Sequence, residues 1–136
     1  MFRGRLFFVA FSVLLLVGTL HALAIYLEWY WTLRWIDMPV HFLGGMWLAL
    51  TALWFFFYSP RPLLSAALRW RVPAVLIAVV AVSISWEVFE VSIGAAGEPG
   101  YALNTARDVT SDILGGMVAL AVAHWFTDEK RAPHAV

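Results

Sequence analysis

Two ten-residue stretches of the chain share a spacing of ionisable residues that suits metal binding or proton transfer. Residues 37–46 read Asp-Met-Pro-Val-His-Phe-Leu-Gly-Gly-Met, and residues 108–117 read Asp-Val-Thr-Ser-Asp-Ile-Leu-Gly-Gly-Met. In each stretch an acid precedes a second ionisable residue by four positions. That spacing places both groups on one helix face, about 6 Å apart along the axis. The pattern predicts two equivalent helices, and the Gly-Gly pairs predict close approach of neighbouring helices.

Seven ionisable residues interrupt long apolar segments of the chain: His21, Asp37, His41, Glu87, Glu90, Asp108 and Asp112. An isolated charge at the centre of a membrane helix costs about 2.5–3.5 kcal/mol, so such groups normally face one another or water. The five carboxylates have no basic side chain among them. They cannot all stay ionised unless a cation neutralises them, and otherwise several must be protonated. We therefore expect one polar site that holds either a divalent metal or shared protons.

The chemistry of these side chains suggests roles for each of them. Oxygen and imidazole ligands favour Mg²⁺, Mn²⁺, Fe²⁺ or Zn²⁺. The expected metal ligands are Asp37, His41, Glu87, Glu90, Asp108 and Asp112. The expected catalytic groups are His21, Glu87 and Asp112. Two rim residues, Arg34 and Arg107, are expected to bind a phosphate or another anionic headgroup.

Several of these residues also have a purely structural interpretation. Asp37 is a good N-cap, and Asp108 in a first helical turn favours the helix dipole. His21 can bond a neighbouring backbone carbonyl. Glu87 and Asp112 lie too deep in their apolar segments for capping, which favours a functional role for these two.

The composition identifies the class of protein. Hydrophobic residues make up 62% of the 136-residue chain and charged residues 13%, against about 25% charged residues in soluble proteins. The chain is therefore expected to be a membrane protein. A formal net charge of zero and the lack of a basic stripe argue against nucleic acid as a partner. The lack of cysteine excludes disulfides, thiolate nucleophiles and cysteine-ligated zinc.

Four apolar segments each approach the ~20 residues that cross a bilayer: 6–27, 36–58, 73–93 and 106–126. Prolines at 60 and 62 end the second segment, and residues 63–71 read as a short interfacial helix. Asn104 or Thr105 is expected to cap the fourth helix. The predicted fold class is all-α. One domain over 1–136 forms a polytopic membrane protein, with four transmembrane helices in two parallel helix-pair half-repeats.

The basic residues predict the orientation. Seven of the nine Lys and Arg residues fall on one side of this topology, and only Arg34 and Arg107 fall on the other. The positive-inside rule then places both termini in the cytoplasm of a bacterium, with the chain a multi-pass protein of the cytoplasmic (inner) membrane. In that orientation the polar site lies in the outer leaflet, with its deepest groups roughly 7–9 Å inside.

Three stretches resemble the conserved motifs of the VanZ-like small polytopic membrane proteins and of the YjdF-type inner-membrane proteins: Asp37-x-x-x-His41-Phe42, Glu87-x-x-Glu90, and the run from Arg107 to Gly115. The resemblance extends over roughly 37–122. The founding VanZ protein is associated with teicoplanin resistance at the Gram-positive envelope. Glu90 stands where VanZ-like proteins often carry Gln, and the YjdF-type pattern has two acids in the third span. The resemblance implies a small cell-envelope protein without a defined reaction.

Three functions fit these observations. The first is a metal-dependent hydrolase or transferase that acts on a lipid or isoprenoid phosphate. The second is a non-enzymatic membrane subunit or chaperone that binds lipids, partner helices or further copies of itself. The third is a proton- or cation-coupled transporter, although the inner two thirds of the apolar segments lack carboxylates. Membrane lipids are expected partners in each case.

Overall fold

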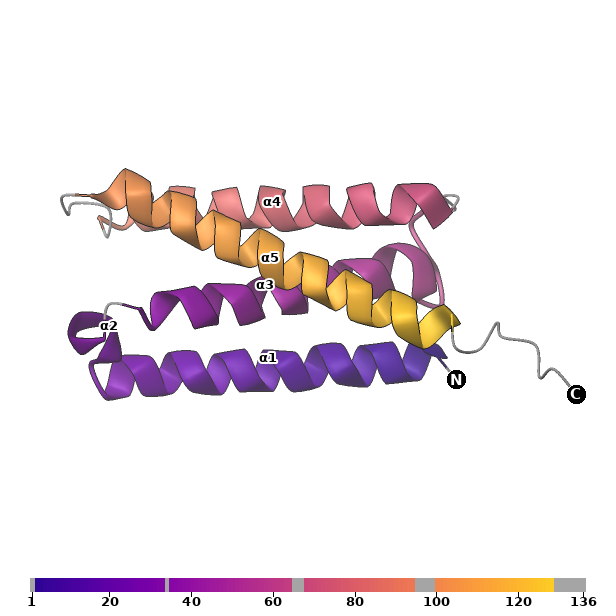
Figure 1. Cartoon of the computed structure of the whole chain (residues 1–136), viewed down its shortest axis with the longest axis horizontal. Coiled ribbons are helices and arrows are strands. Elements are labelled where there is room, and N and C mark those ends of the chain that lie inside the picture. The colour runs from indigo at the N-terminus through magenta and orange to yellow at the C-terminus, as the bar shows by residue number, and fades with distance from the viewer. Residues whose placement is uncertain (1, 34, 65–67, 95–99, 129–136) are drawn as a thin grey trace, which may run out of the picture.

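The computed structural model describes residues 2–33, 35–64, 68–94 and 100–128. These residues form six helical elements: α1 (Phe2–Tyr26), α2 (Trp29–Thr32), α3 (Asp37–Leu53), η1 (Trp54–Tyr58), α4 (Leu68–Ser92) and α5 (Tyr101–Asp128). The described part of the chain is all-helical, as expected. Helices α1 and α4 run in one direction and α3 and α5 in the other (Figure 1). The start of α1 and the end of α5 therefore lie at one end of the molecule, which we call the terminal end, and α2 lies at the opposite end.

Apart from a terminal residue in three of them, the four expected apolar segments lie within a long helix or a continuous helix pair. Three of them are long and apolar enough to cross a membrane by length and composition: Arg3–Tyr26, Asp37–Tyr58 and Arg71–Ser92. The 28-residue α5 carries Asp108 and Asp112 and is not one of these three. The chain is thus a membrane protein, with three candidate spans among its described residues.

The connection between η1 and α4 differs from the expected interfacial helix over 63–71. Leu63 and Leu64 are not helical, residues 65–67 lie outside the described part, and residues 69–71 belong to the first turns of α4. The Leu64 N–H donates to the Phe56 carbonyl at 2.9 Å, so the chain folds back on η1. The prolines at 60 and 62 prevent a helix directly after η1. Helix α4 begins at Leu68 and therefore contains Pro73, the first residue of the expected segment 73–93.

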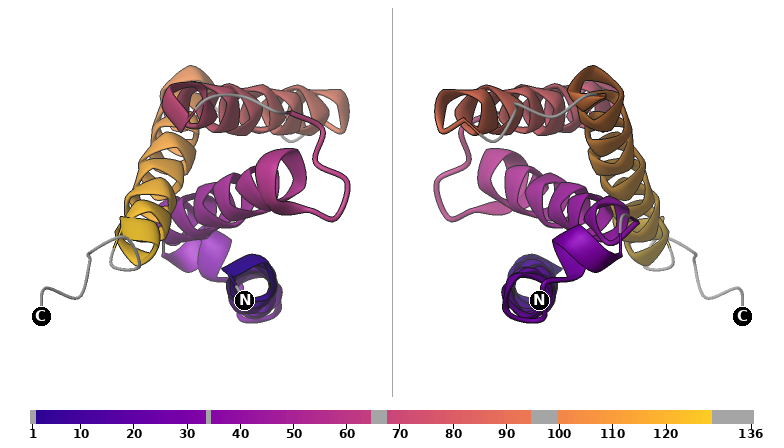
Figure 2. Two further views of the ribbon diagram at one scale, coloured as in Figure 1. Left: turned by 90° about the vertical axis from the view of Figure 1, so that its right-hand side faces the viewer. Right: turned by 90° about the vertical axis from the view of Figure 1, so that its left-hand side faces the viewer.

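Helix α3 is the centre of the bundle. It contacts α1, α4 and α5, and its most extensive contact is with α5. The end-on views show α1 set to one side of α3, with α4 and α5 on the other (Figure 2). The face that α1 turns away from α3 is apolar and exposed, including Phe8 at 68% and Leu15 at 56%. Exposed apolar surface of this extent fits a lipid environment.

The crossing of α3 and α5 depends on glycine. A Cβ atom on Gly45 would collide with the backbone carbonyl of Asp112, and one on Gly115 would collide with the carbonyl of Phe42. The two helix backbones therefore touch directly. A Cβ on Gly44 would meet only the Asp112 Oδ1 atom, at 3.6 Å. The close approach expected of the two Gly-Gly pairs occurs between the two repeated stretches themselves.

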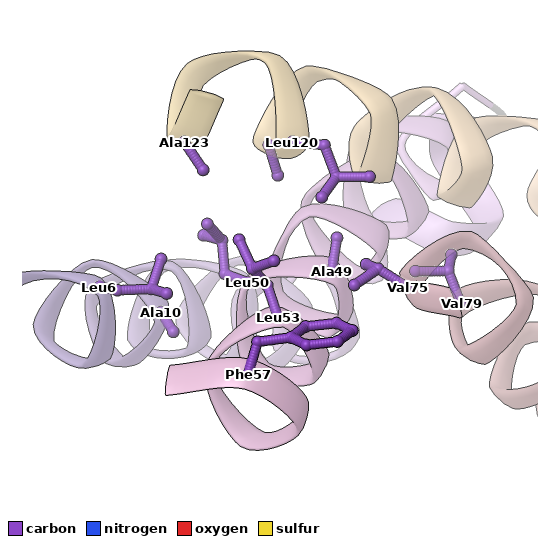
Figure 3. Close-up of a cluster of buried hydrophobic side chains, with 11 residues drawn as sticks. Leu6, Ala10, Ala49, Leu50, Leu53, Phe57, Val75, Val79, Leu120 and Ala123 are labelled. Carbon is purple, nitrogen blue, oxygen red and sulfur yellow. The ribbon is translucent and has the colours of Figure 1, made fainter. Parts of the chain in front are cut away.

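An apolar core fills the terminal half of the bundle (Figure 3). Each helix of the bundle contributes: Leu6 and Ala10 from α1, Ala49, Leu50 and Leu53 from α3, Phe57 from η1, Val75 and Val79 from α4, and Ala119, Leu120 and Ala123 from α5. The ionisable residues of the predicted site lie in the other half. The fold thus separates an apolar end from a polar end.

Candidate metal centre

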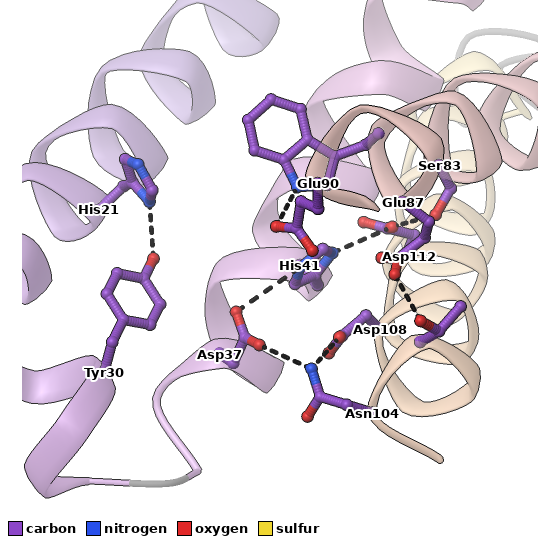
Figure 4. A network of polar contacts seen from close by, with 12 residues as sticks. His21, Tyr30, Asp37, His41, Ser83, Glu87, Glu90, Asn104, Asp108 and Asp112 are labelled. Atoms are coloured by element: carbon purple, nitrogen blue, oxygen red, sulfur yellow. Dashed lines mark hydrogen bonds and ion pairs between the residues drawn. The ribbon is translucent and has the colours of Figure 1, made fainter. Parts of the chain in front are cut away.

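His41 is the residue that joins the two repeated stretches. It lies one turn after Asp37, the first residue of α3. Its Nε2 atom lies 3.6 Å from Asp37 Oδ1, and its Nδ1 atom lies 3.2 Å from Oδ2 of Asp112 on α5 (Figure 4). The imidazole is therefore held between one carboxylate of its own helix and one of the neighbouring helix.

Asp37, His41 and Asp108 form a group that could hold a metal ion. Each offers one ligand atom, and these atoms all lie within 4.8 Å of one another. The Asp108 residue is only 2% exposed. Its Oδ2 accepts a hydrogen bond of 2.7 Å from Asn104, and its Oδ1 is buried with no hydrogen-bond partner among the described residues. An unpaired buried carboxylate oxygen is costly, and a cation would satisfy it.

Asp112 contacts the His41 imidazole at Nδ1, the ring nitrogen that does not face Asp37. The Asp112 residue is 4% exposed, and its Oδ2 accepts hydrogen bonds from His41 Nδ1 and from the Ser83 hydroxyl of α4. A carboxylate on Nδ1 keeps the proton there and leaves Nε2 free to ligate. The arrangement resembles a carboxylate–histidine–metal triad, with Asp112 in the place of the carboxylate that orients the histidine. Its expected roles as a ligand and as a catalytic group stay predictions.

The two acids of α4 lie outside the group of three. The Glu87 residue is 5% exposed, and its Oε2 accepts hydrogen bonds from Thr105 at 2.6 Å and from Tyr101 at 3.3 Å. Its Oε1 is buried and has no hydrogen-bond partner in the described part of the chain. Glu90 accepts a hydrogen bond of 2.8 Å from the indole of Trp86. The fold brings both acids to the polar end without adding them to the ligand group.

His21 belongs to a separate pair. Its Nδ1 atom shares a hydrogen bond of 2.6 Å with the hydroxyl of Tyr30, a residue of α2 (Figure 4). Burial, with the nearby carboxylates of Asp37 and Glu90, raises the pKa of Tyr30 to about 12. The phenol therefore keeps its proton at physiological pH. The catalytic role expected for His21 stays a prediction.

Of the two basic residues expected to bind an anion at the rim, Arg107 lies among the described residues and Arg34 does not. Arg107 is exposed and directly precedes Asp108 on α5. Arg34 lies outside the described residues, so its expected anion-binding role stays a prediction. Lys130 and Arg131, which contributed to the expected orientation, also lie outside them.

The site includes polar residues that the sequence analysis did not assign to it. Asn104 and Thr105 were expected as helix caps, but α5 begins at Tyr101, after Gly100 with a φ of 96°. Both side chains therefore project from the second turn, where Asn104 donates to Asp108 and Thr105 donates to Glu87. The i,i+4 spacing of Asn104 and Asp108 was the available signal, because such pairs share a helix face.

The comparison with known families gives one match. A family model described as predicted membrane protein (DUF2238) matches residues 4–129, which include nearly all of the four long helices. No curated protein and no solved structure matches the chain. The match agrees with the apolar helices and the exposed apolar surface. The chain belongs to the DUF2238 family of predicted membrane proteins.

Proposed function

We propose that this protein holds a divalent metal ion between α3 and α5 and uses it to bind and act on a lipid phosphate. The observation that carries the proposal is the group of Asp37, His41 and Asp108, whose ligand atoms lie within 4.8 Å of one another. The unpaired, buried Asp108 Oδ1 supports a cation there. Three protein ligands leave coordination positions open, as in catalytic metal sites. Mixed carboxylate and imidazole ligands suit Mg²⁺, Mn²⁺, Fe²⁺ or Zn²⁺.

The surrounding residues would take distinct roles. A bound divalent ion would screen phosphate charge and lower the pKa of a bound water. Asp112 would keep the His41 imidazole in its ligating orientation through the 3.2 Å contact with Nδ1. Glu87, with one carboxylate oxygen buried and unpaired, would accept the proton of the attacking water. Arg107, exposed next to Asp108, would hold the phosphate.

The membrane arrangement that fits this function has four spans, with α5 as the fourth. The shared direction of α1 and α4, and of α3 and α5, is compatible with two parallel half-repeats, α1 with α3 and α4 with α5 (Figure 1). With both termini in the bacterial cytoplasm, as the basic residues predict, the metal centre faces the outer leaflet. A lipid phosphate headgroup could then reach it from the membrane surface. The resemblance of its motifs to VanZ-like and YjdF-type envelope proteins is compatible with that location.

Metal binding is the first test. Detergent-purified protein, stripped with a chelator, is titrated with Mn²⁺ and Zn²⁺ by calorimetry. We expect about one ion per chain for wild type, and loss of binding for His41→Ala and Asp108→Asn. Glu90→Gln is the matched control, because Glu90 is an acid of the same end whose carboxylate binds Trp86 instead. Unchanged binding in folded His41→Ala would overturn the proposed site.

Turnover is the second test. The metal-loaded protein is incubated with phosphatidic acid and with an isoprenyl phosphate, and released inorganic phosphate is measured. Hydrolysis consumes one water, breaks a phosphorus–oxygen bond and leaves the lipid alcohol. We expect release to require the metal and to fall in Glu87→Gln. Metal-dependent lipid binding without release would make the protein a binding protein for lipid phosphates and would remove the enzymatic part of the proposal.

A second function, a purely structural polar cluster in a membrane subunit, is favoured by one observation. Ser83, Asp112 and His41 form a continuous hydrogen-bonded chain across α4, α5 and α3. Such a chain can hold helices together without any ligand. In that case His41→Ala would lower the thermal stability of the metal-free protein, and added metal would not raise the stability of wild type. Under the metal proposal, added Mn²⁺ or Zn²⁺ raises the wild-type melting temperature.

A further inference from the structure

A second concave site lies at the terminal end, away from the metal centre. Helix α5 runs obliquely to α4 (Figures 1 and 2), and a cavity of about 320 Å³ lies where the first turns of α4 face the last turns of α5. Its lining is mainly apolar and includes Leu53, Leu76, Met117, Leu120 and Ala121. Met117 is 51% exposed, so the cavity opens at the side of the bundle. That side faces lipid in a membrane.

The cavity also contains a fixed cation, Arg71. The guanidinium carbon of Arg71 lies 5.3 Å from the ring centre of Phe57 and 5.3 Å from that of Tyr58. Its Nη1 donates a 2.8 Å hydrogen bond to the Tyr58 hydroxyl. The Nε atom of Arg71 is buried and has no hydrogen-bond acceptor among the described residues. The ion pairs among the described residues all involve His41, so none of them neutralises Arg71. An arginine stays charged in proteins, so this position favours an anion.

The local backbone explains why Arg71 is held in place. Residues Trp54–Tyr58 form the π-helix η1, which continues α3. A π-helical turn is rare and is often found at functional sites. Here it presents two consecutive rings, Phe57 and Tyr58, to one guanidinium. Cation–π contacts restrict the long side chain, which otherwise extends toward water.

We propose that this cavity binds one anionic phospholipid, with the phosphate at Arg71 and part of an acyl chain against the apolar lining. The combination of one unneutralised guanidinium and an apolar, laterally open cavity matches the two parts of such a lipid. A volume of about 320 Å³ lies at the small end of ligand pockets. It is too small for a partner helix, whose diameter is about 10–12 Å. The site does not depend on the metal centre or on the proposed activity.

Native mass spectrometry of the delipidated full chain tests this proposal. The probes are phosphatidylglycerol and phosphatidylcholine with identical acyl chains. Wild type is expected to bind one phosphatidylglycerol in preference to phosphatidylcholine. Arg71→Gln is expected to weaken phosphatidylglycerol binding about tenfold and to abolish the preference. Arg61→Gln is the matched control, because Arg61 is exposed and does not line the cavity.

A steric pair tests the apolar part separately. Ala121→Phe fills the cavity and is expected to weaken binding of both lipids, whereas Val122→Phe, on the next residue outside the lining, is expected to leave binding unchanged. If Arg71→Gln does not fold, Arg71→Lys is used, and we expect weaker binding with the preference kept. Equal binding of the two lipids by wild type, or unchanged binding in Ala121→Phe, would overturn the proposal. So would competition by glycerol phosphate as strong as by the lipid, or a dimer that Ala121→Phe dissociates.

Discussion

Oδ2 of Asp112 lies 3.2 Å from Nδ1 of His41, across a helix crossing and 71 positions along the chain. The two residues occupy the same place in the two repeated stretches, five positions into each. The repeat therefore pairs with itself in space, and one copy supplies the imidazole while the other supplies the carboxylate that orients it. Among the positions at which the two copies differ, the fifth, His in one copy and Asp in the other, makes this pair.

Asp112→Asn tests the positioning role of this carboxylate. The amide keeps the size of the side chain but no longer fixes the proton on Nδ1 of His41. We expect the affinity for Mn²⁺ or Zn²⁺ to fall about 10–100-fold, as for other residues that orient metal ligands. Calorimetric titration measures the change, and circular dichroism confirms the helical fold. Complete loss of binding would instead make Asp112 a direct ligand, and unchanged affinity would leave it without a role at the metal.

Gly45→Ala and Gly115→Ala are expected to lower the stability of the protein. At each position the added Cβ meets backbone atoms of the facing helix, which cannot rotate away. Overpacking costs about 1–3 kcal/mol or more, which exceeds the gain of about 1 kcal/mol from higher helix propensity. Thermal unfolding in detergent, followed by tryptophan fluorescence, measures the loss.

Two other glycines are the controls for this prediction. A Cβ on Gly18 meets nothing within 4 Å, so Gly18→Ala should keep or raise the melting temperature. A Cβ on Gly44 meets only the end of the Asp112 side chain, so Gly44→Ala should have an intermediate effect. Equal effects at Gly18 and Gly45 would contradict the direct contact of the α3 and α5 backbones.

Thr105→Val tests the environment of Glu87. The Thr105 hydroxyl donates a hydrogen bond of 2.6 Å to Glu87 Oε2. Valine keeps the shape of the side chain but has no hydrogen-bond donor. Because the Glu87 carboxylate already has one unpaired oxygen, we expect the free energy of unfolding to fall by about 1–3 kcal/mol. Thr110→Val on the same helix is the control, since Thr110 donates to the Ala106 carbonyl and is exposed. Equal melting temperatures for the two variants would argue against a structural role for this bond.

Tyr30→Phe tests the half-buried phenol. The pKa of Tyr30 is raised from 10.0 to about 12 in the folded protein. Its contribution to stability is therefore complete below pH 10 and is lost as the pH rises to about 12. The difference in tyrosinate absorbance between wild type and Tyr30→Phe should show a transition near pH 12. A transition near pH 10 would mean that Tyr30 is exposed to solvent.

Much of the fold follows from pattern. The four apolar segments and the close glycine contacts could be predicted because burial in a membrane imposes long apolar runs and small residues at helix crossings. The helix start at Tyr101 was not readable, because Gly100 and the cap-like residues Asn104 and Thr105 give competing signals within one turn.

The sequence indicated which ionisable residues could lie together, but not the contacts that each of them makes. The spacing of Asp37, His41, Asp108 and Asp112 indicated which residues share a face, yet it could not separate ligands from positioning residues. That distinction depends on the rotation of each helix about its axis. For α1, which is apolar on all sides, the sequence does not define this rotation. The contact of His21 with Tyr30 was therefore not predictable.

The π-helix η1 has a consequence for how this chain can vary in length. The π-helical turn formed by Trp54–Tyr58 holds about one residue more than an α-helical turn. Deleting one residue there would let the turn close as an α-helical turn while the chain beyond it keeps its place. In the interior of an α-helix the same deletion rotates everything downstream by about 100°. A single-codon deletion in this stretch should therefore be tolerated better than one in the middle of α3.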